Sequence, residues 1–223
     1  MFDCQAILFD LDGTLVDSIA AVDRAWAKWA LRHNLDPKVV VPQIHGRRAI
    51  DSLRLLISHP SIDIQQEFAW LEEVEAADTE GVVLIKGALD FVQSVPNDRW
   101  SIVTSGTSPV ARARMGAVGL TPVNAVFGED VPNGKPSPDP YLLAAARMGV
   151  NPQDCVVFED TVAGVRSGKA AGMRVIAITA GAYRPDLEIA DLVVPDYTAL
   201  KLALKPGGLR IDRNIKQQGK IKN

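Results

Sequence analysis

The 223-residue chain is 47% hydrophobic and 23% charged, and its net charge of −3 gives no general reason to expect a nucleic-acid partner or a membrane surface. This length suits one α/β domain with a smaller insert, and no apolar run approaches the length needed to span a membrane. Cys4 and Cys155 each begin an apolar run, which predicts buried free thiols in a reducing, cytoplasmic compartment rather than a disulfide framework.

The first predicted element is a buried strand over 6–9 that ends on acidic residues. These four residues are all apolar, as in strands of a sheet covered on both faces. Asp10 and Asp12 follow, then the turn residue Gly13 and the hydroxyl of Thr14. Ligands bind beyond the carboxyl ends of strands in open α/β sheets, and two neighbouring carboxylates repel each other. The pattern therefore predicts a positive group, such as a metal ion, between them.

Three helices without intervening strands are expected next. The first begins at a cap formed by Asp17 or Ser18 and is ended by Asn34 and Pro37, and the second is closed by Pro60. Apolar residues at helical spacing mark the three helices: Ile19, Val22, Trp26 and Trp29, then Ile50, Leu53 and Ile57, then Ile64, Phe68 and Leu71. This pattern predicts a small helical subdomain directly after the first strand.

The helical insert would occupy 17–81, and the core would consist of 1–16 and 82–223. In the core we expect helices over 88–95, 109–118, 138–148 and 161–171, and strands over 100–103, 124–127, 155–158, 175–178 and 192–194. Strands that alternate with helices predict a parallel sheet with right-handed crossovers. The stretch after Pro206 has only scattered apolar residues, so we expect a frayed or weakly docked tail, and the basic residues from Lys205 onward make it positively charged.

Two further segments carry groups suited to phosphate. Thr104, Ser105 and Gly106 follow the strand over 100–103, where a hydroxyl and free backbone amides suit phosphate oxygens. Lys135 stands between a glycine and a proline just before a helix, which holds it more rigidly than a surface lysine.

The strand over 155–158 again ends on two acids, Glu159 and Asp160. Two carboxylates without a basic neighbour in sequence favour a hard cation, because such cations prefer oxygen ligands. Four strand-end motifs thus occur in order along the chain: Asp-Leu-Asp-Gly-Thr-Leu, Val-Thr-Ser-Gly-Thr, Gly-Lys-Pro-x-Pro-x-Pro-Tyr and Glu-Asp-Thr.

Together these motifs resemble the haloacid dehalogenase superfamily of phosphohydrolases. The resemblance extends from Ala6 to about Val194 and includes a helical cap inserted after the first motif, as in one subgroup of the superfamily. It implies an α/β fold with a Rossmann-like parallel sheet and a small helical cap domain. Within the superfamily the motifs are most similar to those of sugar, hexitol and glycerol phosphate phosphatases.

The resemblance also implies a Mg²⁺-dependent phosphoaspartate mechanism. Asp10 would be the nucleophile, and Asp12 would act first as the acid and then as the base. Mg²⁺ would be held by Asp10, the backbone carbonyl of Asp12 and Asp160, with Glu159 binding it directly or through water. The phosphoryl group would be bound by Thr104, Ser105, Gly106 and Lys135.

Substrate choice is expected to lie in the cap, in the segment His45-Gly46-Arg47-Arg48 at the start of its second helix. Gly46 lets a loop approach the site, and His45, Arg47 or Arg48 would hydrogen-bond polyol hydroxyls or a second charged group. A solvated basic turn is the alternative, and the sequence leaves the choice open for each of these side chains. The expected partner is a small phosphorylated metabolite, and the protein would be a monomer or a homodimer.

Two other functions remain alternatives. A beta-phosphoglucomutase-like phosphoryl transferase would share the fold and the phosphoaspartate, but such mutases place a histidine where this chain has Val22 and an arginine where it has Ala49. A non-catalytic sugar-phosphate sensor on the same fold would typically lack one of the catalytic acids. Here Asp10, Asp12 and Asp160 are all present.

Overall fold

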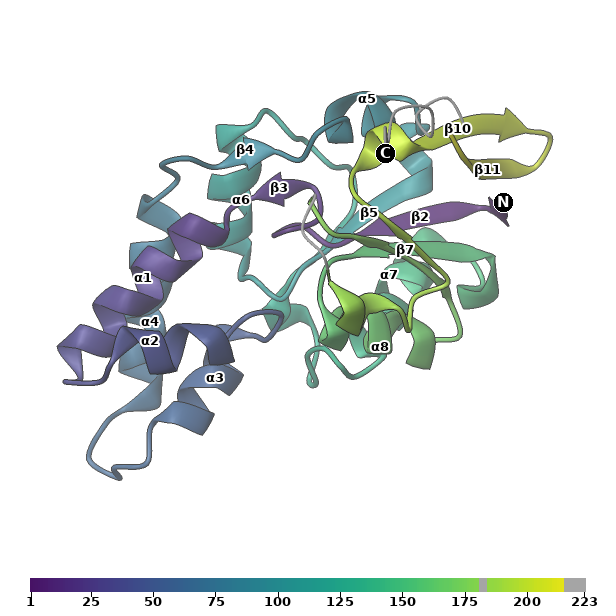
Figure 1. The fold of residues 1–223 in the computed structure, drawn as a ribbon. Coiled ribbons are helices and arrows are strands. Elements are labelled where there is room, and N and C mark those ends of the chain that lie inside the picture. The colour runs from purple at the N-terminus through teal and green to yellow at the C-terminus, as the bar shows by residue number, and fades with distance from the viewer. Residues whose placement is uncertain (181–183, 215–223) are drawn as a thin grey trace.

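The computed structural model describes residues 1–180 and 184–214 (Figure 1). Its helices are α1 (Ile19–Arg32), α2 (Pro37–Val40), α3 (Ala49–Leu56), α4 (Ile64–Ala77), α5 (Ala88–Gln93), α6 (Ser108–Ala117), α7 (Asp139–Met148) and α8 (Val162–Ala170). Its strands are β1 (Phe2–Cys4), β2 (Ala6–Phe9), β3 (Val16–Asp17), β4 (Val83–Leu84), β5 (Trp100–Val103), β6 (Ala125–Val126), β7 (Cys155–Glu159), β8 (Arg174–Ile178), β9 (Leu192–Val194), β10 (Leu200–Lys205) and β11 (Gly208–Arg213). Among these described helices, none has the length and apolar character required to cross a bilayer.

Six strands form one parallel sheet in the order β6-β5-β2-β7-β8-β9. β2, the strand that the sequence predicted over 6–9, lies inside the sheet between β5 and β7. Helices α6, α7 and α8 connect successive parallel strands, as the alternation of elements predicted. The chain is therefore an α/β protein with a Rossmann-like sheet, and the carboxyl ends of β2, β5 and β7 lie at the same edge.

The central strand alternates its side chains between two cores. Ile7 and Phe9 belong to the core on the side of α5 and α6, and Ala6 and Leu8 belong to the core on the side of α7 and α8. All four side chains are fully buried. Burial on both faces explains why β2 reads in sequence as an uninterrupted apolar run.

Helices α1 to α4 form a separate helical cap, seen at the lower left of Figure 1. Its core contains the buried Trp26, Trp29, Leu53 and Leu71. Two short antiparallel strands, β3 and β4, stand where the chain enters and leaves the cap. Helix α4 of the cap packs on helix α6 of the core, and this contact joins the cap to the core.

The cap contains one short helix more than the sequence predicted. We expected Pro37 to end the first helix, but α1 already ends at Arg32 and Pro37 opens α2 instead. The side chain of Asp36 accepts a hydrogen bond from the amide of Lys38 at 2.9 Å, which caps this helix. A proline suits the first turn of a helix because its missing N–H would have no partner there.

The prediction of a frayed or weakly docked tail after Pro206 is wrong for the part that the structure describes. Strands β10 and β11 form a hairpin, and β11 pairs on its other side with β1, which the sequence analysis did not predict. Leu209 and Ile211 are buried, with exposed fractions of 1% and 0%. Their spacing of two residues is that of a strand with one buried face, a weak signal in so short a segment. Residues 215–223, which include much of the basic tail, lie outside the described residues.

Candidate active site

A cavity of about 470 Å³ lies between the carboxyl-terminal edge of the parallel sheet and the helical cap. The core contributes Asp10, Asp12, Thr104, Ser105, Gly106, Lys135 and Asp160 to its lining. The cap contributes Val22, Trp26, Ile44, His45, Gly46, Arg47, Ala49, Phe68 and Leu71. The four motifs that the sequence analysis identified, which are far apart in the chain, therefore meet around one cavity.

Lys135 is buried at the base of this site and pairs with two carboxylates. Its ammonium donates to Oδ1 of Asp10 at 2.6 Å and to Oε1 of Glu159 at 2.5 Å. It also donates to the carbonyl oxygen of Val103 at 3.0 Å. Burial opposes the charge on Lys135, but the two carboxylates outweigh this effect and raise its pKa. The lysine is thus a fixed, permanently charged neighbour of Asp10.

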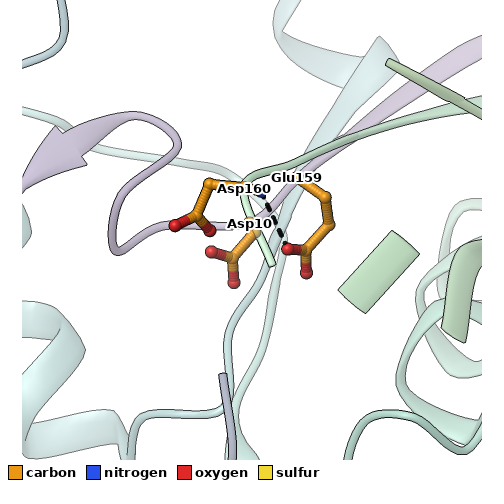
Figure 2. A group of neighbouring side chains, drawn as sticks. All are labelled: Asp10, Glu159 and Asp160. Carbon is orange, nitrogen blue, oxygen red and sulfur yellow. Dashed lines mark hydrogen bonds between the residues drawn. The ribbon is translucent and has the colours of Figure 1, made fainter. Parts of the chain in front are cut away.

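Carboxylates outnumber cations at this point of the molecule. Asp10, Glu159 and Asp160 each offer an oxygen atom within 4.8 Å of the others, and Figure 2 shows Asp10 between the other two side chains. With Lys135, the formal charge of the ionised group is −3 + 1 = −2. Burial raises the pKa of Asp10 to about 7, and it holds the pKa of Asp160 well above the usual 3.8. A buried, oxygen-rich group with excess negative charge fits a hard divalent cation such as Mg²⁺.

The turn after Asp12 brings the chain into contact with Asp160. Gly13 has a left-handed backbone with φ of 81°, and a β-carbon at this position would overlap the carboxylate of Asp160. The hydroxyl of Thr14 lies 3.4 Å from Oδ2 of Asp10 and 3.4 Å from Oδ1 of Asp160. Gly13 therefore leaves room for the carboxylate of Asp160, and the hydroxyl of Thr14 links Asp160 to Asp10.

Glu159 is fully buried, and both of its oxygens already have partners in the protein. Oε1 accepts from Lys135 and from the hydroxyl of Tyr141 at 2.9 Å. Oε2 accepts from the amide of Asp160 at 3.0 Å, drawn as the dashed line in Figure 2, and from the amide and hydroxyl of Thr161. These contacts hold Lys135 in place. Binding of a metal by Glu159, directly or through water, stays a prediction.

Asp12 lines the cavity and is held from two sides. The hydroxyl of Ser18 donates to its Oδ1 at 2.5 Å, and Nη1 of Arg114 lies 2.9 Å from its Oδ2. Ser18 occupies the cap position of α1, as the sequence analysis proposed, but its side chain makes no capping hydrogen bond because the hydroxyl binds Asp12 instead. The orientation of Asp12 thus depends on the first residues of the cap and on a core helix.

The loop after β5 provides polar groups at the cavity wall. The hydroxyl of Thr104 accepts a hydrogen bond from the amide of Gly106 at 3.0 Å. The hydroxyls of Ser105 and Thr107 are buried, yet neither has a hydrogen-bond partner among the described residues. Buried polar atoms without partners are costly, and an anion in the cavity would satisfy them. This loop therefore fits a phosphate group.

Three of the four residues in the cap segment 45–48 line the cavity, and the fourth lies away from it. His45, Gly46 and Arg47 line the cavity. Gly46 has φ of 75°, and a β-carbon here would lie 2.9 Å from Oγ1 of Thr161, so this loop does approach the core closely. Arg48 is not among the lining residues.

Arg48 instead joins the cap to a loop of the core. Its guanidinium pairs with Asp51, with Nε 2.6 Å from Oδ2, and donates to the carbonyl oxygens of Gly128, Val131 and Pro132. The guanidinium of Arg48 is thus directed to a core loop and not to the cavity, which argues against its predicted role in substrate recognition. The sequence did not predict this contact because the loop is eighty residues further along the chain.

Sequence reasoning missed Arg114, Glu75 and Tyr141. One signal for Arg114 was available: it lies at helical spacing from the apolar Val110 and Ala111, so it is a charged residue on the buried face of α6. Its guanidinium joins Asp12 to Glu75 of α4, with Nη2 3.0 Å from Oε2 of Glu75. Burial raises the pKa of Glu75.

Comparisons of sequence and of structure with known proteins point to the same family. The sequence model of the haloacid dehalogenase-like hydrolases matches residues 4–172. Hexitol phosphatase A of Escherichia coli (strain K12) is 48% identical over 92% of this chain and 97% of that protein. 2-Deoxyglucose-6-phosphate phosphatase 1 of Saccharomyces cerevisiae is 32% identical over 90% of this chain and 91% of that protein. A hydrolase from Pseudomonas syringae has a similar fold, with a TM-score of 0.76 at 24% identity over 85% of this chain and 92% of that one.

Proposed function

The chain belongs to the haloacid dehalogenase-like hydrolase family and is an enzyme, and from this premise we propose that it is a Mg²⁺-dependent phosphatase of small phosphorylated sugars or polyols. The substrate class comprises hexose, hexitol, deoxysugar and glycerol phosphates. The reaction would proceed through a phosphoaspartate on Asp10. A cytoplasmic location stays a prediction.

This proposal rests on the buried ion pair of Asp10 and Lys135. The pair lies at a cavity that Asp12 also lines. Lys135 lies 2.6 Å from one carboxylate oxygen of Asp10, and it offsets negative charge where a phosphate would approach. Asp12 follows Asp10 by two residues and reaches the same cavity. One carboxylate is thus available as the nucleophile and a second for proton transfer.

In the first half-reaction, a carboxylate oxygen of Asp10 attacks phosphorus and the bond from phosphorus to the ester oxygen breaks. Asp12 gives its proton to that leaving oxygen, so the product is a neutral alcohol. In the second half-reaction, Asp12 takes a proton from water while the water oxygen attacks phosphorus. The bond from phosphorus to the carboxylate oxygen of Asp10 then breaks, which releases inorganic phosphate and leaves Asp10 as a carboxylate and Asp12 protonated, as at the start.

The remaining residues would bind and orient the phosphate. The hydroxyl of Thr104 and the backbone of Gly106 line the cavity and suit the phosphoryl oxygens. The hydroxyl of Ser105, which has no partner within residues 1–180 and 184–214, suits them as well. Asp10 and Asp160 would hold Mg²⁺ together with the backbone carbonyl of Asp12. Mg²⁺ would supply positive charge that reduces the repulsion between the nucleophile and the anionic substrate.

The cap side of the cavity supports a sugar or polyol as the leaving group. It combines apolar side chains such as Trp26 and Phe68 with the polar His45, Arg47 and Glu72. Such a lining suits the alternating C–H and O–H groups of a carbohydrate. Val22 and Ala49, where mutases of this fold carry polar side chains, both line the cavity with apolar groups. Relatives named for hexitol and 2-deoxyglucose 6-phosphate hydrolysis agree with this substrate class.

The test is phosphate release from a panel of sugar, hexitol, glycerol and nucleotide phosphates in the presence of Mg²⁺. We expect the highest kcat/KM with hexitol or hexose phosphates, and loss of release with Asp10→Asn or with a chelator. Release that survives Asp10→Asn would contradict the phosphoaspartate mechanism. If no ester is hydrolysed but beta-glucose 1-phosphate is isomerised when the bisphosphate is added, the phosphatase proposal is wrong and the protein is a mutase. Tight binding of a phosphate ester without turnover would identify a sensor.

A further inference from the structure

Arg114 is a buried charge that links the cap to the acid Asp12. It lies on core helix α6 with an exposed fraction of 3%. Its Nη1 is 2.9 Å from Oδ2 of Asp12, and its Nη2 is 3.0 Å from Oε2 of Glu75 on cap helix α4. One guanidinium therefore joins two carboxylates that come from different parts of the chain.

A purely structural reason for this arginine is weak. Its neighbours on the buried face of α6, Val110, Ala111 and Met115, are apolar, and an apolar residue would continue that face. Burial of an arginine with two acids costs desolvation free energy that often cancels the attraction between the charges. Glu75 is itself buried, with an exposed fraction of 9%. This unfavourable burial is explained if the arrangement serves Asp12, which faces the cavity.

The two carboxylate oxygens of Asp12 are held by groups from different parts of the chain. Oδ1 accepts from Ser18 at the start of α1, and Oδ2 pairs with Arg114. Proton transfer requires the donor oxygen to be held within hydrogen-bond distance of the leaving oxygen, and small displacements are costly. Arg114 also places a positive charge beside the carboxylate that Asp12 becomes after it has given up its proton.

We propose that Arg114 is a positioning residue for proton transfer from Asp12 to the leaving oxygen, and that Glu75 of the cap holds Arg114 in place. This inference rests on the proposed phosphatase function and deepens it. Because Glu75 belongs to α4, the position of the cap helix contributes to the alignment of the acid. A core that has lost contact with α4 would bind phosphate but protonate the leaving group poorly.

The test separates leaving groups that need a proton from one that does not. Sorbitol 6-phosphate releases a poor alkoxide leaving group, whereas p-nitrophenyl phosphate releases a stable phenolate. With enzyme in excess, release of the leaving group in a single turnover reports the first half-reaction only. For Arg114→Met we expect release of sorbitol to slow by roughly 10–100-fold, and release of p-nitrophenol to slow by less than about threefold.

Three further variants control this result. Glu75→Gln keeps the size of the side chain and is expected to give the same selectivity with a smaller loss. Arg114→Met combined with Asp12→Asn is expected to be no slower than Asp12→Asn alone, because the two residues act in one step. Arg112→Met removes an exposed arginine of the same helix and is expected to leave both rates unchanged.

Equal loss with both substrates for Arg114→Met and for Glu75→Gln would overturn the proposal, because a merely structural role does not distinguish leaving groups. If Arg114→Met does not fold, as judged by circular dichroism and thermal unfolding, Glu75→Gln and Arg114→Lys decide by the same ratio of rates. A wild-type protein that hydrolyses neither substrate would contradict the proposed function instead. The two failures are thus distinguishable.

Discussion

Nζ of Lys135 lies 2.6 Å from Oδ1 of Asp10 although 125 residues separate them in sequence. Water solvates neither charged group well, since Lys135 is 5% exposed and Asp10 is 6% exposed. The same ammonium also pairs with the fully buried Glu159. The ammonium group of Lys135 is therefore the buried partner of two carboxylates, one of which is the proposed nucleophile.

Lys135→Met is expected to destabilise the protein at pH 8 by about 3–5 kcal/mol, because it leaves the carboxylates of Asp10 and Glu159 buried without a cation. Urea unfolding of the metal-free protein measures this change. Lys169→Met is the matched control, since Lys169 forms an exposed ion pair with Asp191 at 2.7 Å and its loss is expected to cost less than about 1 kcal/mol. Equal effects of the two variants would contradict the role assigned to Lys135.

Mg²⁺ is expected to stabilise the protein more at pH 8 than at pH 5.5. The pKa of Asp10 is about 7 in the folded metal-free protein, above its ordinary value of 3.8, because of burial. Between these values the folded state binds the extra proton, so the stability of the metal-free protein falls as pH rises from about 4 through 7. Mg²⁺ must displace this proton at low pH but not above the folded pKa.

Thermal unfolding with and without Mg²⁺ at the two pH values measures this difference. At saturating metal we expect a rise in Tm of roughly 5 °C at pH 8 and a smaller rise at pH 5.5. Asp10→Asn is the control and is expected to reduce the effect of Mg²⁺ at both pH values. An effect of Mg²⁺ that is equal at pH 5.5 and pH 8 would show that Asp10 is not linked to metal binding.

Gly164→Ala is expected to destabilise the protein by about 1–3 kcal/mol and to reduce activity. A β-carbon at position 164 would overlap the carboxylate of Glu159, so the partner of Lys135 would have to move. Gly116→Ala in helix α6 is the matched control, because a β-carbon there meets no atom within 4 Å. This control is expected to stabilise the protein by about 0.5–1 kcal/mol. Chemical unfolding of both variants provides the comparison, and stabilisation by Gly164→Ala would be the contrary result.

Ile211→Ala is expected to cost about 2–4 kcal/mol of stability, although it lies beyond the parallel sheet. Ile211 is fully buried where β11 pairs with β1. Leu204→Ala, at the exposed turn end of the neighbouring strand β10, is expected to change stability by less than about 0.5 kcal/mol. Similar small effects of the two substitutions in urea unfolding would indicate that the hairpin contributes little to the fold.

The sequence by itself determined the α/β class, the central strand and most of the site. Apolar runs that end on Asp10 and Glu159 identify strands buried on both faces, and parallel strands place their carboxyl ends at one edge. That rule brings Asp10, Asp12, Thr104 and Asp160 together without any knowledge of distances. The helical periodicity of the insert likewise predicted the cap, because buried faces repeat at a fixed spacing.

Only the tertiary structure decided which charges meet and where the cap touches the core. The carbonyl oxygens that bind Arg48 and the carboxylates that bind Arg114 lie on segments distant in sequence, and no local pattern specifies a pairing across such a distance. The hairpin of β10 and β11 was missed because its buried face consists of few residues, and its pairing with β1 joins opposite ends of the described chain. Local propensity determines where elements form, whereas long-range packing determines which side chains they bring into contact.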